Sequence, residues 1–212
     1  MTQDIEQRSD DWFAARLGKV TASKIADVMA RTKTGYSASR ANYAAQLITE
    51  RLTGRREEGY TNAAMQWGTD TEPQARAMYE LETGATVVGC GFFDHPDALI
   101  AAGASPDGLV GDDGLVEIKC PNSATHIATL RGEAIPDKYI KQMQWQMACT
   151  ERQWCDFASF DPRLPDAMQL FVKRIERDDD LIDEMTEAVQ NFLEEVDAAV
   201  ADLENRYMKE AA

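Results

Sequence analysis

Two carboxylates and a lysine stand close together near the middle of the sequence. Asp107 lies in one β-type run, and Glu117, Ile118 and Lys119 lie in the next, with the Gly-Asp-Asp-Gly segment 111–114 between them. Two β-type runs around such a segment predict a hairpin. Because side chains alternate along a strand, Glu117 and Lys119 project from one face while Ile118 points into the core.

This hairpin brings together groups that suit phosphodiester hydrolysis. With a four-residue loop, Val110 pairs with Leu115, so Asp107 lies beside both Glu117 and Lys119. Mg²⁺ takes one or two carboxylates and leaves positions for water and a substrate phosphate. A metal there would lower the pKa of a water, and Lys119 would orient or deprotonate that water and neutralise the phosphate.

The competing interpretation is a surface hairpin with an ordinary Glu117–Lys119 ion pair, which is common and adds little stability. The Pro106-Asp107 step ahead of it favours a site. We assign Asp112-Asp113 to the turn, because tight turns select acidic residues between glycines. Cys120 is expected to be buried or inert, since no histidine is near it in the sequence.

The pattern of Pro106-Asp107 and Glu117-Ile118-Lys119 is that of restriction-endonuclease-like nucleases. The surrounding sequence resembles the phage lambda exonuclease and YqaJ-type viral recombinase family, in the family's order from about residue 9 to about residue 177. The matching blocks are Trp12, Arg16-Leu17-Gly18, Val20-Thr21-Ala22-Ser23, Trp67-Gly68 with Glu72, Ser105-Pro106-Asp107-Gly108-Leu109, Glu117-Ile118-Lys119-Cys120-Pro121, Tyr139 with Gln142, and Phe160-Asp161-Pro162-Arg163.

The resemblance implies a restriction-endonuclease-like α+β core of α/β/α type, with a central mixed, mostly antiparallel sheet flanked by helices. It also implies that Asp107 and Glu117 ligate the metal together with the Ile118 carbonyl, and that Lys119 acts on the attacking water. Glu72 would approach the same metal from a helix.

A second helix is expected to supply Gln142. On a helix, Tyr139, Gln142 and Gln146 fall on one stripe, whereas Gln144 lies nearly opposite Gln142. The residues alone would make Glu72 and Gln142 ordinary helix-surface residues. The resemblance instead implies that Gln142 lies at the active centre.

The resemblance further implies a pocket for a 5′-phosphate formed by Arg16, Ser23 and Ser105. A guanidinium grips a terminal phosphate bidentately, and a helix N-terminus near Ser23 would favour the anion. The competing interpretation is a surface ion pair of Arg16 with Asp11 or Glu6.

The implied activity is a Mg²⁺-dependent 5′ to 3′ exonuclease acting on double-stranded DNA ends, with Mn²⁺ as a substitute and two ions at the site. It would release 5′ mononucleotides and leave 3′ overhangs for phage-type recombination. Relatives form a homotrimeric ring around DNA, and the implied partner is a phage-type single-strand annealing protein. Lys33 stands where relatives present a cation to the duplex, in the segment that differs most from them.

Two alternatives remain open. One is an endonucleolytic or structure-specific DNA nuclease with the same metal site. The other is a DNA-binding assembly subunit that no longer cuts, which the intact set of Asp107, Glu117 and Lys119 disfavours.

The elements that must position these residues follow from hydrophobic spacing and cap signals. Asp10 or Asp11 is expected to cap a helix that runs to Arg16, with basic linkers between the later helices. Glu72 would lie at a helix N-terminus. The other predicted helices are 23–29 (capped by Thr21), 37–52, 69–81 and 135–150, and the predicted strands are 86–88, 92–93, 99–102, 115–118, 154–160 and 168–175.

Residues 178–209 are predicted to form one long amphipathic helix, with apolar residues at three- and four-residue steps from Leu181 to Tyr207. Residues 176–212 carry 13 acidic side chains against 3 basic ones. The acidic run is most simply a solvated helix face, and the other interpretation is a subunit or partner surface.

The whole chain of 212 residues fits a single domain, with a helical N-terminal segment (residues 1–84), a catalytic sheet (residues 85–175) and the C-terminal helix. The net charge of −15 argues against a polyanion partner, but residues 8–40 hold 7 basic side chains against 3 acidic ones.

No apolar run approaches the ~20 residues that span a bilayer, so no membrane association is expected. The acidic N-terminus is unlike a signal peptide, which predicts a protein that is not exported. Together with the resemblance to phage proteins, this implies a location in the cytoplasm of a bacterial host cell. The four cysteines show no C-x-x-C pair and are expected to be thiols. Zinc is disfavoured because His95 and His126 are the chain's only imidazole donors, so a zinc site would need mixed, scattered ligands.

Overall fold

The computed structural model describes residues 5–33, 35–56 and 62–208. Its main sheet has five strands in the order β10-β9-β8-β7-β4, and of these pairs β8–β9 is parallel while the others are antiparallel. The expected mixed, mostly antiparallel sheet is confirmed. Its strands are β4 Val87–Val88, β7 Gly108–Val110, β8 Gly114–Lys119, β9 Trp154–Phe160 and β10 Leu170–Glu176.

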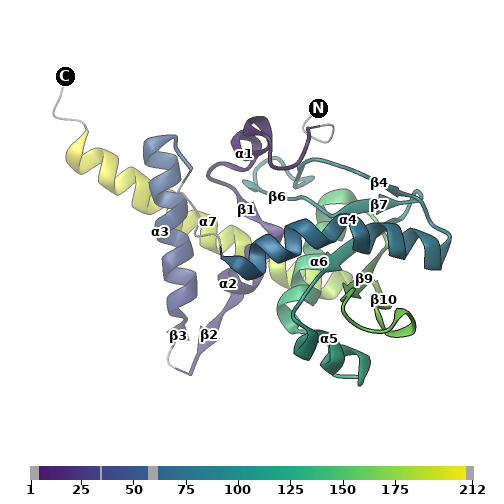
Figure 1. The fold of residues 1–212 in the computed structure, drawn as a ribbon. Helices are drawn as coiled ribbons and strands as arrows, with labels where there is room; N and C mark the ends of the chain where they lie inside the picture. Colours follow the sequence, from purple (N-terminus) through teal and green to yellow (C-terminus); the bar gives the residue numbers. More distant parts are fainter. Residues whose placement is uncertain (1–4, 34, 57–61, 209–212) are drawn as a thin grey trace.

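Helices cover both faces of this sheet (Figure 1). Helix α4 (Ala63–Thr83) buries Ala75 and Tyr79 against one face, together with Val116 and Ile118 of β8. Helix α6 (Asp137–Thr150) packs its methionines against the other face, where Leu115 points. Alternate side chains of β8 therefore pack into two hydrophobic cores, one on each face of the sheet. The predicted α/β/α arrangement is confirmed.

The β7–β8 hairpin forms with a register one residue away from the prediction. Val110 pairs with Gly114, whereas the four-residue loop had paired it with Leu115. The loop is shorter because Gly111 takes a left-handed conformation, with φ of +54°. Gly114 already belongs to the strand, where the indole of Trp154 lies so close that a Cβ would come within 2.1 Å of it.

The N-terminal region contains short strands as well as helices. Strand β1 runs parallel to β6 in a three-stranded sheet of order β1-β6-β5, and β2 and β3 form a separate hairpin where a basic linker was expected. These elements are α1 Asp10–Arg16, β1 Val20–Thr21, the 3₁₀ helix η2 Ala22–Lys24, α2 Ile25–Met29, β2 Arg31–Thr32, β3 Gly35–Tyr36, α3 Ala38–Thr53, β5 Phe93–Asp94 and β6 Ala102–Ala104.

Two predicted helix caps are wrong. Ser9 caps α1 by accepting a hydrogen bond from the Trp12 amide, so Asp10 and Asp11 lie inside the first turn. The Thr21 side chain caps nothing, because this residue is still in strand β1. The short hydroxyl side chain directly before the helix is the favoured cap in the first case.

The C-terminal helix α7 (Asp179–Tyr207) is confirmed as one long helix, capped by Asp178. Its middle packs into a core shared with α2, α3, α6, β1 and β6. The predicted apolar stripe does not stay buried to its end: Tyr207 is 77% exposed, where the helix extends beyond the body (Figure 1). The predicted end at residue 209 lies outside the described residues.

Two further helices lie near the sheet: α5 (Ser123–Leu130), which was not predicted, and the 3₁₀ helix η3 (Asp166–Met168). The four cysteines are free thiols, as expected. No helix within the described ranges combines the length and the apolar character needed to cross a bilayer.

Candidate active site

The open end of the β7–β8 hairpin brings Asp107, Glu117 and Lys119 together. Asp107 is half-buried directly before β7, and its carboxylate accepts a hydrogen bond of 2.7 Å from the Ile118 amide. Gly108 follows because a Cβ there would meet a Val87 side-chain methyl at 2.1 Å. The glycine therefore lets β4 approach the strand that carries Asp107.

The three charged groups form one electrostatic cluster. Glu117 is buried at 1% exposure, and its Oε1 accepts a hydrogen bond from Lys119 Nζ. Burial and the neighbouring carboxylate of Glu117 raise the pKa of Asp107 to about 8, and Lys119 offsets this only in part. Burial alone would lower the pKa of Lys119, but the two carboxylates outweigh it and move the pKa above its usual value.

Helix α6 closes the cluster from the other side with two glutamines. Gln142 Nε2 donates to Glu117 Oε1 at 2.7 Å, and Gln146 Nε2 donates to Oε2 at 2.6 Å. Tyr139 lies on the same stripe, with its ring centroid 5.0 Å from Lys119 Nζ. The predicted stripe is confirmed, and the prediction missed only that Gln146 also reaches the carboxylate. The four-residue step from Gln142 was the signal.

Glu72 lies in the middle of α4, and its predicted position at a helix N-terminus is wrong. The helix begins nine residues earlier, at Ala63, because the Asn62 side chain caps the amides of Ala64 and Met65. Pro73, expected in a first turn, is inside the helix, where it leaves one carbonyl of the preceding turn without its usual donor.

Two arginines that sequence reasoning missed hold Glu72 in place. Arg8 Nη2 lies 3.4 Å from Glu72 Oε2, and Arg76 Nη2 lies 3.6 Å from Oε1. Arg76 also donates to the backbone carbonyl of Asp107. The four-residue step from Glu72 to Arg76 is a sequence signal for their ion pair, whereas no local spacing indicates that Arg8 contacts Glu72.

A groove of about 1040 Å³ opens over the cluster. Its walls include Glu72 from α4, Asp107 and Lys119 from the hairpin, and Lys138 from α6. Trp67 and Arg163 form part of the outer wall, with the guanidinium 4.4 Å from the indole centroid. The Arg163 guanidinium is fixed by the Asp161 carboxylate of the Phe-Asp-Pro-Arg motif.

The oxygen donors of this groove fit a hard divalent cation. Within residues 5–33, 35–56 and 62–208 no group of three or more His, Cys, Asp or Glu side chains is close enough to hold a metal by itself. The two carboxylates Asp107 and Glu117 suffice for Mg²⁺, which takes one or two carboxylates and keeps several waters. Burial is the largest cause of the raised pKa of Asp107, and the carboxylate of Glu117 is the next. The crowding of these two carboxylates also favours a positive charge between them.

Arg16 and Ser105 meet beside the cluster, and Trp12 joins them. Arg16 Nη1 and Trp12 Nε1 both donate to Ser105 Oγ, at 3.2 and 2.9 Å, and the guanidinium stacks 4.0 Å from the indole centroid. Burial lowers the pKa of Arg16 to about 10, so the side chain stays charged at neutral pH. No ion pair of Arg16 with Asp11 or Glu6 is found among the residues that the structure describes.

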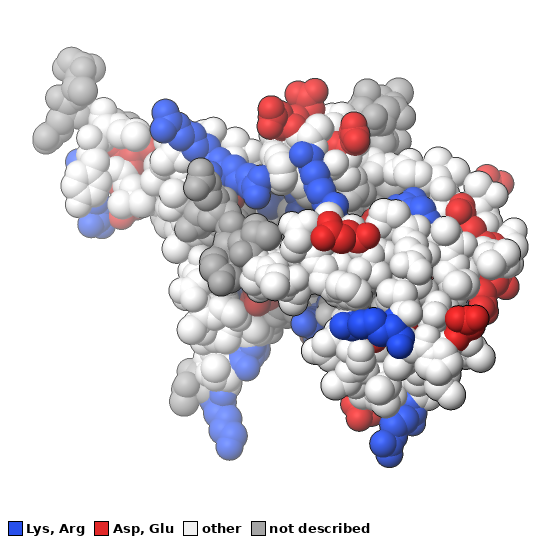
Figure 2. Space-filling model, in the orientation of Figure 1, with Lys and Arg blue, Asp and Glu red and all other residues white. Residues whose placement is uncertain are grey.

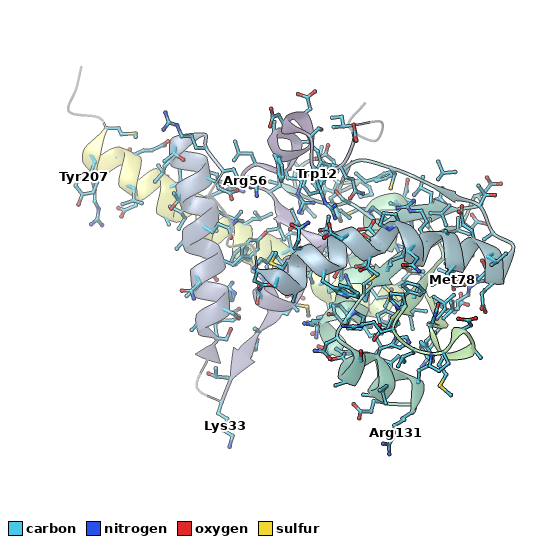
Figure 3. The ribbon with its side chains drawn as sticks, in the orientation of Figure 1. Trp12, Lys33, Arg56, Met78, Arg131 and Tyr207 are labelled. Atoms are coloured by element: carbon cyan, nitrogen blue, oxygen red, sulfur yellow. The ribbon has the colours of Figure 1, made fainter. Side chains whose placement is uncertain are left out.

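Ser23 and Lys33 are placed differently from one another. Ser23 is exposed in η2, shortly after the end of β1, and Ser105 directly follows the end of β6. Strands β1 and β6 are parallel neighbours, with Thr21 paired to Gly103, so the two serines follow the same ends of adjacent strands. Lys33 is exposed at the tip of the β2–β3 hairpin and points away from the body (Figure 3). The structure does not bring Lys33 to the cluster.

A family profile and solved structures both match this chain over most of its length. A family profile for the YqaJ-like viral recombinase domain matches residues 11–153. The chain is 58% identical to an alkaline exonuclease from Laribacter hongkongensis, with a TM-score of 0.88 over 96% of this chain and 100% of that one; a second crystal structure of that enzyme holds dAMP.

A phage-related exonuclease from Haemophilus somnus 129PT shares the fold at 17% identity and a TM-score of 0.68, over 87% of this chain and 96% of that one. No curated protein sequence gave a significant match. The profile covers well over half of the chain, and the motifs that it spans include the hairpin and the α6 stripe. This chain therefore belongs to the YqaJ-like viral recombinase family, with the restriction-endonuclease-like fold.

Proposed function

We propose that this chain is a Mg²⁺-dependent deoxyribonuclease, acting as a single domain, that degrades one strand of linear double-stranded DNA from its 5′ end. The observation that carries the proposal is the joint placement of the Asp107, Glu117 and Lys119 cluster in a groove and of the Arg16–Ser105 pair beside it. Family membership and the 58% identical alkaline exonuclease support a DNA exonuclease.

The residues that would hold the metal are Asp107 and Glu117, with the Ile118 carbonyl and Glu72 as further donors. Arg8 and Arg76 keep the Glu72 carboxylate directed along the groove wall. When bound, Mg²⁺ makes a water a stronger nucleophile and stabilises the charge that develops at phosphorus. The proposal includes Mn²⁺ as a substitute, because Mn²⁺ accepts the same oxygen ligands as Mg²⁺. It also includes a second ion at the site.

Lys119 acts on the attacking water and the scissile phosphate. Its upward-shifted pKa keeps it an ammonium, which can orient the water and donate to a phosphate oxygen. Gln142 holds the Glu117 oxygen that Lys119 also contacts, so it fixes the relative position of these two groups.

The direction of digestion comes from Arg16, Ser105 and Ser23. A terminal 5′-phosphate would accept hydrogen bonds from the guanidinium and the two hydroxyls. It would thereby place the bond between the first two nucleotides at the cluster. Cleavage there releases a 5′ mononucleotide and extends a 3′ overhang, the product that strand annealing requires.

Assembly reconciles this activity with the net charge of −15. On the face in Figure 2, Lys and Arg side chains adjoin one another near the upper end of α3 and are scattered elsewhere, and acidic side chains gather over α1 and at the edge farthest from α3. A ring of three chains would turn a basic lining toward DNA and acidic surface outward, and a single-strand annealing protein would take up the overhang. Native mass measurement should give about 71 kDa, three times the 23.6 kDa chain, and a mass near 24 kDa would overturn the ring.

The decisive assay compares two substrates with and without Mg²⁺: a linear duplex with 5′-phosphates and a covalently closed circle. We expect loss of the linear duplex only, with a label at the 5′ end released as mononucleotide before a label at the 3′ end. Cutting of the circle would establish the endonuclease alternative instead, and an intact linear duplex would establish the assembly subunit.

A further inference from the structure

Gln146 is a buried glutamine that reaches an active-site carboxylate. It lies on α6 one turn after Gln142, and its side chain is fully buried. Its Nε2 donates to Glu117 Oε2 at 2.6 Å, while Gln142 and Lys119 both contact Oε1. Gln146 is thus the residue that holds the carboxylate oxygen farther from Lys119.

The other end of the Gln146 amide has no such partner. Its Oε1 is buried without a hydrogen bond to any described residue. Leaving a buried acceptor unpaired is costly, and turning the amide would be worse, because two acceptor oxygens would then face each other. The orientation of the Gln146 amide is therefore dictated by Glu117.

Gln144, on the opposite side of the same helix, provides the contrast. It is buried at 2% exposure, and both ends of its amide are satisfied: Nε2 donates to the Glu176 carbonyl at 2.8 Å, and Oε1 accepts from the Asp178 amide at 2.9 Å. Gln144 ties α6 to the start of α7, as a structural buried glutamine does. The Gln146 side chain hydrogen-bonds to Glu117 and to no other described residue.

We infer that Gln146 is a positioning residue for the metal site. By fixing Glu117 Oε2, it stops the buried carboxylate from rotating. Because Oε1 already accepts from Gln142 and Lys119, this keeps the remaining lone pair of Oε2 available before an ion arrives. Such supporting hydrogen bonds to ligating carboxylates are typically worth 10- to 100-fold in metal affinity or activity. The inference rests on the proposed function for the identity of the ion.

The test is the affinity of the DNA-free protein for Mg²⁺, measured by calorimetry on Gln146→Met and on Gln144→Met. Methionine keeps the length of the side chain and removes the donor. We expect Gln146→Met to raise the Kd for Mg²⁺ by about 10- to 100-fold. The Mg²⁺ concentration that gives half-maximal DNA degradation should rise by a similar factor, without a change in the KM for DNA ends. Gln144→Met should lower the melting temperature and leave the Kd for Mg²⁺ unchanged.

The inference is overturned if folded Gln146→Met binds Mg²⁺ within about twofold of wild type, or if Gln144→Met weakens binding equally. Should Gln146→Met fail to fold, Gln146→Asn provides the same test, because its polar amide is one methylene too short to reach Glu117. Wild-type protein that binds Mg²⁺ but leaves DNA ends intact would refute the proposed function alone, and the Kd comparison would still decide the role of Gln146.

Discussion

At the scale of single residues, Lys119 differs from an ordinary strand lysine in what surrounds its ammonium group. It contacts Glu117, lies above the ring of Tyr139, and keeps 25% of its side chain exposed toward the groove. The carboxylates hold it charged, and the exposed part is what a water or a phosphate can reach. Both properties are needed by a group that acts on the attacking water.

Lys119→Ala should reduce the rate of DNA degradation by about 10²- to 10³-fold, the usual effect of removing one donor that stabilises the charge developing in the transition state. DNA and Mg²⁺ binding should persist, because Asp107 and Glu117 remain. Lys173→Ala, an exposed lysine of β10, is the control and should act like wild type. A Lys119→Ala variant with more than about a tenth of the wild-type rate would remove this residue from the mechanism.

In the proposed function, the direction of digestion depends on Arg16. Arg16→Ala should erase the preference for 5′-phosphorylated over 5′-hydroxyl ends, since a charge-assisted contact of about 1.5–3 kcal/mol is lost. The rate on phosphorylated ends should fall roughly 10- to 150-fold, measured beside Arg131→Ala at the far end of α5 (Figure 3). If Arg16→Ala still prefers phosphorylated ends as strongly as wild type, the pocket lies elsewhere.

At the scale of elements, the hairpin and α6 carry most of what the sequence could predict. The alternation along residues 114–119 and the stripe from Tyr139 to Gln146 are local periodicities. In the structure the side chains lie on the faces that these periodicities predict. The beginning of α4 was misplaced because Trp67-Gly68 resembles a break, whereas the actual start is the Asn62 cap. The Arg8–Glu72 pair spans 64 residues, a distance over which local spacing carries no information.

The corrected hairpin register leads to a test of its own. Gly114→Ala should lower the free energy of unfolding by about 1–3 kcal/mol, because a Cβ would overlap the Trp154 indole in a packed layer. Gly68→Ala is the control: it lies inside α4 with no atom within 4 Å of the added Cβ, and should stabilise by up to about 1 kcal/mol. Urea unfolding with an unchanged m-value measures both. A Gly114→Ala protein as stable as wild type would argue against the three-residue loop.

At the scale of the whole molecule, an acidic protein must concentrate its few free cations where DNA lies. Most basic side chains near the groove are already committed: Arg8 and Arg76 to Glu72, Arg163 to Asp161, and Lys119 to Glu117. Lys138 is exposed on the groove wall, and its described contact is with the ring of Tyr139 at 4.8 Å. Its charge is therefore the one most available to a phosphate.

Lys138→Ala should weaken DNA binding and make the logarithm of the binding constant less steep in the logarithm of salt concentration. One phosphate contact contributes about 0.7 to 0.9 to that slope, through the counterions that it releases. Lys141→Ala is the matched control, because Lys141 lies three residues further along α6 but is paired with Asp137. Binding is measured in Ca²⁺, whose looser coordination should support binding without cleavage. Equal slopes for Lys138→Ala and wild type would mean that the DNA strand does not follow this wall, and the path through the groove would have to run along α4 instead.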